Sequence, residues 1–178
     1  MRGLANVRQA VAGTLVASLV LACASSFAVE RDALEAAIVY NLLLFVEWPG
    51  ETGWETRTLT LCLDPASPLL AAAHALEGRP VRGMRLVVRT LEADPHGCQA
   101  ILVDSSAAMK SAATVRGNTG KDAVLLVEAS SFDRFDAATI QLVEADGRLA
   151  FDISLKRAKE VGLAVSSRLL RLARKVSE

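Results

Sequence analysis

A chain of 178 residues is long enough to fold as one domain around a sizeable core. Its 20 basic and 20 acidic residues give a formal net charge of zero, and without the first 28 residues the chain has 18 basic and 20 acidic residues, a net charge of −2. Because nucleic-acid binding requires a basic face that neutralises phosphates, this balance argues against nucleic acid as a partner.

The N-terminal segment has the parts of a secretory signal peptide. Its basic head holds two arginines and no acid, and residues 10–22 form an apolar run that is too short to span a bilayer as a helix. Ser26-Phe27-Ala28 then fits the cleavage rule of a small residue, any residue and a small residue. We therefore predict that residues 1–28 are a signal peptide and that residues 29–178 form the exported chain, with the bacterial periplasm as its location.

A second interpretation depends on Cys23. Val20-Leu21-Ala22-Cys23 resembles a lipobox, the motif in which the cysteine is lipidated and becomes the first residue after cleavage. The protein would then be a membrane-anchored lipoprotein, whereas in the first interpretation Cys23 leaves with the signal. Both interpretations predict export from the cytoplasm.

Apolar runs and turn residues alternate along the rest of the chain. A helix is predicted from residue 32 to Trp48, apolar on nearly every side and so buried from several directions, and Pro49-Gly50 ends it. The short apolar runs that follow predict strands, and the stretches rich in Ala and Ser between them predict helices. We expect strands at 59–63, 81–91 (with a weak point at Gly83), 98–103 and 123–127, helices at 66–76 and 105–115, and loops at 116–122 and 128–138, the last with Phe132 and Phe135.

The segment from Thr139 to Val176 predicts a hairpin followed by two helices. Asp146-Gly147 separates two β-type runs and favours a two-residue type I′ turn, because both central residues need positive φ. Ser154 is a plausible N-cap of the first helix, and Gly162 can end that helix in the left-handed conformation. The second helix is expected to carry one apolar stripe with arginines off it, the stripe being Leu169, Leu172, Ala173 and Val176 and the arginines Arg168, Arg171 and Arg174.

The order of these elements indicates the α/β class. Strands and helices alternate in the middle of the chain, which is the pattern of a parallel sheet covered by helices, and the hairpin adds antiparallel strands. We predict one domain with a mixed, mostly parallel sheet flanked by helices, and with a C-terminal hairpin and helices.

The residues that could carry chemistry do not form a catalytic motif. RGNTGKD at 116–122 resembles part of a phosphate loop, but it lacks the required glycine and the required hydroxyl. The two histidines stand in no hydrolase or metalloprotease motif. Asp64 and Asp104 follow strands, where they could line a crevice or cap the next helices, and capping is favoured. The sequence therefore predicts no catalytic residue, no cofactor and no metal site.

Two cysteines remain after signal cleavage, Cys62 and Cys98. An even pair in an oxidising compartment is typical of a disulfide, and the bond requires that the two predicted strands lie side by side. The alternative is two buried free thiols, one of which, Cys98, would stand near His96 and could be reactive.

Five motifs resemble those of the YfiR family of exported bacterial proteins, in the same order. They are YNLLLFVEWP at 40–49, LTLCLDP at 59–65, GCQAILVDSS at 97–106, VLLVEASSF at 124–132 and DGRLAFDISLKRAKEVGLAVSSRLLRLA at 146–173. The chain departs from the family's usual residues at Gln99, at Ala137-Ala138 and at Ser154. The resemblance covers nearly all of the predicted exported chain.

The resemblance implies a periplasmic binding protein without catalysis. The best-understood members of the family repress an inner-membrane diguanylate cyclase by binding its periplasmic domain, and an outer-membrane lipoprotein can draw the repressor away, so that cyclic di-GMP and biofilm formation rise. The expected partners are therefore such a cyclase and such a lipoprotein. A second copy of the chain is a further candidate partner, which the resemblance does not imply. The alternative function is a small-ligand-binding protein or a thiol-dependent enzyme of the envelope.

Four residues are candidates for contact with a partner. Trp48 is one because tryptophan is enriched in binding hot spots, although its ring could instead close the core beside Pro49. Asp152 is expected on the polar face of the last strand, and Arg168 and Arg171 on the outer face of the last helix.

Overall fold

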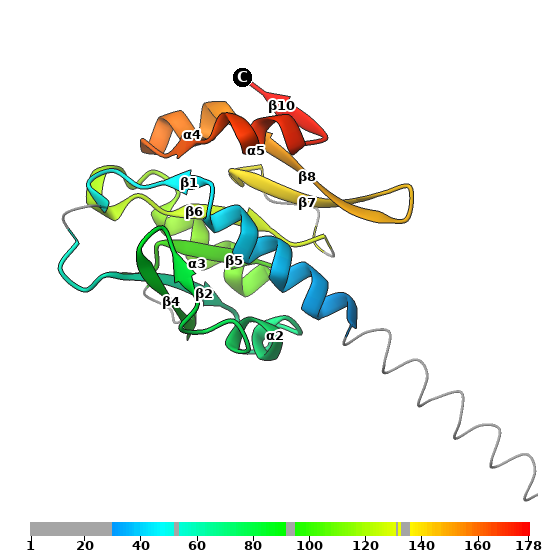
Figure 1. Ribbon diagram of the computed structural model, residues 1–178, viewed down its shortest axis with the longest axis horizontal. Coiled ribbons are helices and arrows are strands. Elements are labelled where there is room, and N and C mark those ends of the chain that lie inside the picture. The colour runs from blue at the N-terminus through cyan, green and yellow to red at the C-terminus, as the bar shows by residue number, and fades with distance from the viewer. Residues whose placement is uncertain (1–29, 52–53, 92–94, 131, 133–135) are drawn as a thin grey trace, which may run out of the picture.

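The centre of the protein is a curled eight-stranded sheet with the strand order β10-β8-β7-β6-β5-β2-β4-β3 (Figure 1). The computed structural model describes residues 30–51, 54–91, 95–130, 132 and 136–178, so the predicted signal peptide, Cys23 and Phe135 lie outside the described residues. The strands are β2 (Thr58–Leu63), β3 (Pro80–Val81), β4 (Met84–Thr90), β5 (Ala100–Val103), β6 (Leu125–Glu128), β7 (Ile140–Ala145), β8 (Arg148–Ser154) and β10 (Lys175–Ser177).

The middle of the sheet is parallel from β4 through β2, β5 and β6 to β7, while β3 and β8 run antiparallel to their neighbours β4 and β7. Every residue of β5 and β6 is buried, as expected for strands covered on both faces. The helices are one over residues 30–43, α2 (Leu70–His74), α3 (Ser106–Val115), α4 (Leu155–Val161) and α5 (Ser167–Leu172), with a 3-10 turn at Gly120–Asp122. The predicted α/β class and mixed, mostly parallel sheet are confirmed.

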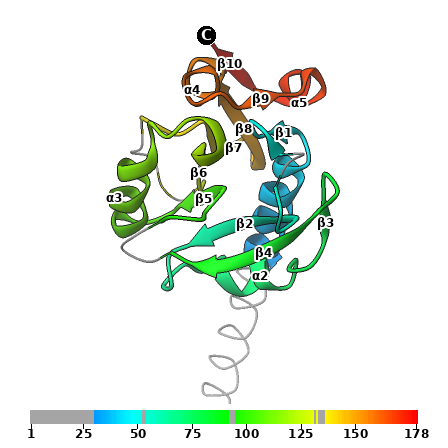
Figure 2. The same cartoon turned by 90° about the vertical axis from the view of Figure 1, so that its left-hand side faces the viewer.

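Hydrophobic side chains form two clusters on opposite faces of the sheet. Along β5, Ala100 and Leu102 belong to one cluster, whereas Ile101 and Val103 belong to the other, because successive side chains of a strand alternate between faces. The first cluster packs against the N-terminal helix, α2, α4 and α5, and the second packs against α3. Figure 2 shows α3 and the N-terminal helix on the two sides of the sheet.

The C-terminal hairpin has the predicted turn. Asp146 and Gly147 have φ angles of 52° and 70°, so both central residues are left-handed. Ser154 caps α4 by accepting a hydrogen bond from the backbone amide of Arg157, and Gly162 follows the helix with a φ of 80°. The local chemistry of this segment is therefore sufficient to specify its turn and the helix that follows.

The predicted helix over 32–48 is too long. It ends at residue 43, and strand β1 (Val46–Glu47) follows and pairs with strand β9 (Ala164–Val165) in a separate two-stranded sheet. The helix is also buried on one stripe rather than on several sides, since Leu34 is 53% exposed. The partner strand is more than 100 residues away in the sequence, so no local pattern marks the end of the helix.

Two predictions in the middle of the chain need correction. The single strand expected at 81–91 is a hairpin of β3 and β4, whose turn is formed by Arg82 and Gly83 with φ angles of 49° and 80°. The predicted weak point at Gly83 is therefore a change of direction. The helix expected at 66–76 is confined to α2, since the residues before it form turns.

The last predicted helix is also too long. It ends at Leu172, and the chain then forms β10, which pairs in parallel with β8 and places Val176 beside Ile153. Leu172 is 65% exposed and Val176 is 38% exposed. The predicted apolar stripe therefore does not include these two residues. The backbone N–H and C=O groups of this segment form hydrogen bonds with β8, in place of the bonds that a further helical turn would have made within the helix.

Candidate functional site

The order of the parallel strands reverses between β2 and β5. The chain passes from β2 to β4 on one side and returns to place β5 on the other side of β2. Ligands of α/β proteins commonly bind outside the carboxyl ends of strands at such a point. Asp64 directly follows β2 and Asp104 directly follows β5, so both predicted aspartates stand at this edge.

Asp64 serves local structure. One carboxylate oxygen accepts a hydrogen bond from the backbone amide of Ala66 at 2.8 Å, and the other accepts one from the hydroxyl of Ser105 at 2.5 Å. Ser105 in turn caps α3 by accepting a hydrogen bond from the amide of Ala108 at 3.0 Å. Asp64 thus closes the turn after β2 and supports the start of α3 through Ser105. The favoured capping interpretation is wrong, because the N-cap of α2 is Leu69, without a side-chain hydrogen bond, and the N-cap of α3 is Ser105 rather than Asp104.

Asp104 is different, because both of its carboxylate oxygens are buried and neither has a hydrogen-bond partner within the part of the chain that the structure describes. Burial raises its pKa above the ordinary value of 3.8, and the nearby carboxylates of Asp64 and Glu35 raise it further. The Ser67 hydroxyl and the backbone of Asp104 oppose this shift, but Ser67 does not meet hydrogen-bond geometry with either oxygen.

Two more carboxylates are buried near the same edge of the sheet, and each has a partner. Glu35 of the N-terminal helix, 4% exposed, accepts hydrogen bonds from the backbone amide and the hydroxyl of Ser130, both at 2.8 Å. Glu128 accepts one from the side-chain amide of Gln141 at 2.8 Å. Through these hydrogen bonds both acids join segments of the fold. Within the described residues no group of His, Cys, Asp and Glu is arranged to hold a metal ion.

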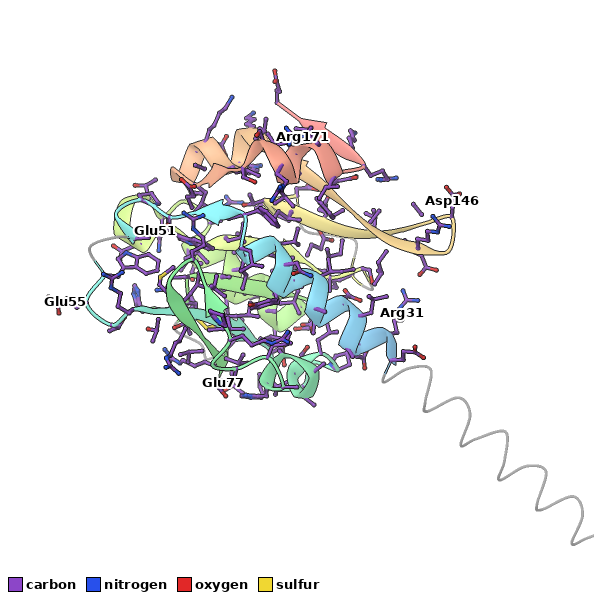
Figure 3. All side chains as sticks on the ribbon, viewed as in Figure 1. Arg31, Glu51, Glu55, Glu77, Asp146 and Arg171 are labelled. Carbon is purple, nitrogen blue, oxygen red and sulfur yellow. A yellow bond between two sulfur atoms is a disulfide. The ribbon has the colours of Figure 1, made fainter. Side chains whose placement is uncertain are left out.

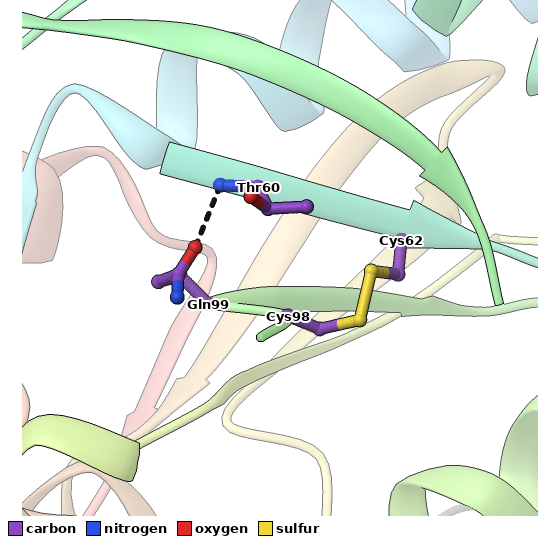
Figure 4. Close-up of a disulfide and its surroundings, with 4 residues drawn as sticks. All are labelled: Thr60, Cys62, Cys98 and Gln99. Atoms are coloured by element: carbon purple, nitrogen blue, oxygen red, sulfur yellow. Dashed lines mark hydrogen bonds between the residues drawn. A yellow bond between two sulfur atoms is a disulfide. The ribbon is translucent and has the colours of Figure 1, made fainter. Parts of the chain in front are cut away.

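Cys62 and Cys98 form a disulfide bond between β2 and the entry to β5 (Figure 4). Their Cα atoms are 5.9 Å apart, and both residues are buried. The two strands are neighbours in the sheet, as the bond requires. Gln99 fixes the entry to β5, because its backbone amide donates to the Thr60 carbonyl and its side-chain carbonyl accepts from the Thr60 amide. Cys98 therefore carries no free thiolate.

Trp48 does not form a surface anchor. It is only 3% exposed, and its indole N–H donates a hydrogen bond to the carbonyl of Gln99 at 3.0 Å. Its ring lies 6.5 Å from that of Trp54, measured between centroids. The alternative interpretation, in which the ring closes the core, agrees with the structure.

The other three predicted contact residues are placed differently from one another. Asp152 lies on the polar face of β8, but its carboxylate is already bound by the guanidinium of Arg174 at 2.8 and 2.5 Å, and only 15% of its side chain is exposed. Arg168 and Arg171 are exposed on α5, where Figure 3 labels Arg171. Asp152 is thus a structural ion-pair partner, while the two arginines are accessible.

The sequence did not predict an apolar groove that lies between the N-terminal helix and the hairpin. It has a volume of about 660 Å³ and is lined by the apolar side chains of Leu34, Ile38 and Leu149, by Gly147, and by the charged residues Glu30, Arg31, Glu144 and Arg148. An ion pair between Arg31 and Glu144, at 2.6 Å, joins the helix to the hairpin at the rim (Figure 3 labels Arg31). The sequence carried a sign of this groove, because Leu34 is an apolar residue of the helix outside the stripe that packs against the core, whereas Ile38 packs against that core at the edge of the groove.

These residues define a small α/β domain whose surface opens into an apolar groove. The chain belongs to the YfiR/HmsC-like family, because the model of that family matches residues 32–174. No curated protein matches the chain. Within the described residues, no helix is both long and apolar enough to span a membrane.

Proposed function

We propose that the protein is a periplasmic regulatory binding protein that represses an inner-membrane diguanylate cyclase and so controls cyclic di-GMP and biofilm formation. Family membership over residues 32–174 is the observation that carries the proposal. The best-understood relatives act in this way, and an outer-membrane lipoprotein that competes for the repressor belongs to the same proposal. A predicted signal peptide supports the location.

The groove between the N-terminal helix and the hairpin is the surface that we assign to the cyclase's periplasmic domain. Leu34 is 53% exposed at this groove, and burying an aliphatic side chain of this size is favourable by about 1.5–3 kcal/mol when burial is complete. Arg31 and Glu144 at the rim supply one charge of each sign for orientation. A partner that inserts an apolar side chain here would bury Leu34 and Ile38 together.

The disulfide bond argues against the alternative function of a thiol-dependent enzyme. Such an enzyme needs a thiolate, and both cysteines of the described chain are joined in one buried disulfide. The buried carboxylates of Asp64, Glu35 and Glu128 bind backbone amides, hydroxyls and one side-chain amide. A binding function therefore fits these residues better than thiol catalysis.

Deletion of the gene tests the proposed function. In a strain whose neighbouring diguanylate cyclase is intact and expressed, we expect cellular cyclic di-GMP to rise. Deletion of the cyclase as well should remove the increase, which is the control for indirect effects. Unchanged cyclic di-GMP in the single deletion would contradict the proposal.

A further inference from the structure

The charge of the chain is divided sharply between its C-terminal layer and the rest. Residues 155–178, here called the basic layer, hold seven basic and two acidic side chains, a net charge of +5. Residues 30–154 hold eleven basic and eighteen acidic side chains, a net charge of −7. A protein that is slightly acidic as a whole therefore presents one strongly basic part.

The basic layer occupies one end of the molecule. α4, α5 and β10 lie together at the top of both Figure 1 and Figure 2, which are related by a quarter turn. The N-terminal helix points away from them, and β4 and β3 form the opposite end of the sheet. The charge asymmetry of the sequence is thus also an asymmetry in space.

Most charges of the basic layer are accessible. Arg157 pairs with Glu160 and Arg174 pairs with Asp152, but the other five basic side chains are exposed and have no ion pair within the described residues. These five are Lys156, Lys159, Arg168, Arg171 and Lys175. Leu172, 65% exposed, and Val176, 38% exposed, stand among them on α5 and β10.

From this arrangement we propose that the basic layer docks the protein on an anionic phospholipid surface. Basic side chains are attracted to anionic lipids, and an exposed Leu can enter the interface between headgroups and acyl chains. An acidic protein surface would satisfy the same charges, but lysine is depleted from protein–protein interfaces, and three of these five side chains, Lys156, Lys159 and Lys175, are lysines. Residues 30–154, which carry a net negative charge, are repelled from such a surface, so the molecule is oriented with its basic layer toward the lipid.

This proposal goes beyond the proposed function, since it requires no particular signalling enzyme. Sedimentation of the purified exported protein with lipid vesicles tests it directly. At low salt the protein should pellet with vesicles of phosphatidylethanolamine and phosphatidylglycerol and stay in the supernatant with vesicles of phosphatidylcholine alone. Added salt should release it, because exposed charges are screened.

Variants distinguish the basic layer from general charge attraction. Each basic side chain near the surface contributes about fivefold to the partition coefficient, so Arg168→Gln with Arg171→Gln should lower it about 25-fold. Leu172→Asn should lower it about fivefold through lost insertion. The matched control, Arg85→Gln with Arg89→Gln, removes two exposed arginines from β4 and should leave binding unchanged. All these side chains are exposed, and circular dichroism verifies the fold of each variant.

The proposal is overturned if the wild-type protein does not pellet with the anionic vesicles at low salt, which is the result expected for a layer that binds an acidic protein instead. It is also overturned if the β4 control loses as much binding as the α5 variant.

Discussion

Burial of an unpaired carboxylate gives Asp104 an unusual role among the acids of this protein. Glu35, Asp64 and Glu128 are buried with hydrogen-bond donors, whereas neither oxygen of Asp104 has one within the described residues. The charged form of Asp104 is therefore penalised, and its pKa is raised by burial first and by nearby carboxylates second. A proton on Asp104 stabilises the folded state.

Replacing this aspartate with its neutral isostere should stabilise the protein. Because the folded-state pKa is raised, the stabilisation from the protonated form is fully present below the ordinary pKa of 3.8 and is lost as pH rises through the folded-state pKa. We expect Asp104→Asn to raise the free energy of unfolding at neutral pH by about 1 kcal/mol, the scale of a buried group left unpaired.

Urea denaturation as a function of pH measures this effect. The gain from Asp104→Asn should shrink toward zero in acid, and Asp122→Asn, at an exposed aspartate, should show no gain at either pH. A destabilised Asp104→Asn variant at neutral pH would show that the charged form of Asp104 contributes favourably to the fold.

The hairpin of β7 and β8 shows how strongly two residues can determine an element. Its turn needs two residues in the left-handed conformation. A residue with a Cβ is destabilised in that conformation unless its side chain, like that of Asp or Asn, can form a local hydrogen bond. Gly147 has a φ of 70° and open space around it, so conformation and not crowding makes glycine necessary there.

Substitution at the turn should therefore cost backbone strain alone. Gly147→Ala is expected to lower the free energy of unfolding by about 1–2 kcal/mol. Gly117→Ala is the matched control, because Gly117 also has open space but no left-handed φ, and it should change stability by no more than about 0.5 kcal/mol. Thermal denaturation of both variants measures the difference. If Gly147→Ala and Gly117→Ala lose the same amount of stability, the positive φ of Gly147 is not the cause.

The disulfide joins elements that are 36 residues apart in the sequence. A bond that closes a loop of this length stabilises a protein by roughly 3–4 kcal/mol in the chain-entropy account. Replacing both Cys62 and Cys98 with Ala should lower the free energy of unfolding by that amount. Guanidinium denaturation under non-reducing conditions measures it. A reductant should then weaken the wild type and leave the double variant unchanged, and a wild type insensitive to a reductant that opens the bond would contradict this account.

Elements with local signals were predictable, and those held by distant partners were not. The apolar runs of β5 and β6, the Asp146-Gly147 turn and the Ser154 cap are each specified by neighbouring residues. By contrast, β1 and β9 are two-residue strands whose pairing spans more than 100 positions. The pairing of β10 with β8 likewise replaces an expected helical turn. Such short strands are too brief to show a period of two.

At the scale of the whole molecule, the sequence indicated which residues could contact a partner, but not which of them the fold leaves exposed or how the surface is arranged. Arg168 and Arg171 were correctly placed on the outside, whereas Trp48 is enclosed and Asp152 is occupied by Arg174. The groove beside Leu34 exists because the hairpin lies along the N-terminal helix, and the Arg31–Glu144 ion pair joins these two elements. Burial and proximity of this kind depend on tertiary packing.

The groove is central to the regulatory function that we propose, and one complementation experiment tests it most directly. Cellular cyclic di-GMP is measured in the deletion strain after return of the wild type, of Leu34→Glu or of Arg85→Gln, each at equal protein level. Leu34 is already exposed, so a charge there should preserve the fold while preventing an apolar side chain from entering the groove. We predict that the wild type and Arg85→Gln restore low cyclic di-GMP and that Leu34→Glu leaves it as high as in the deletion. Full restoration by Leu34→Glu would contradict the groove as the docking surface.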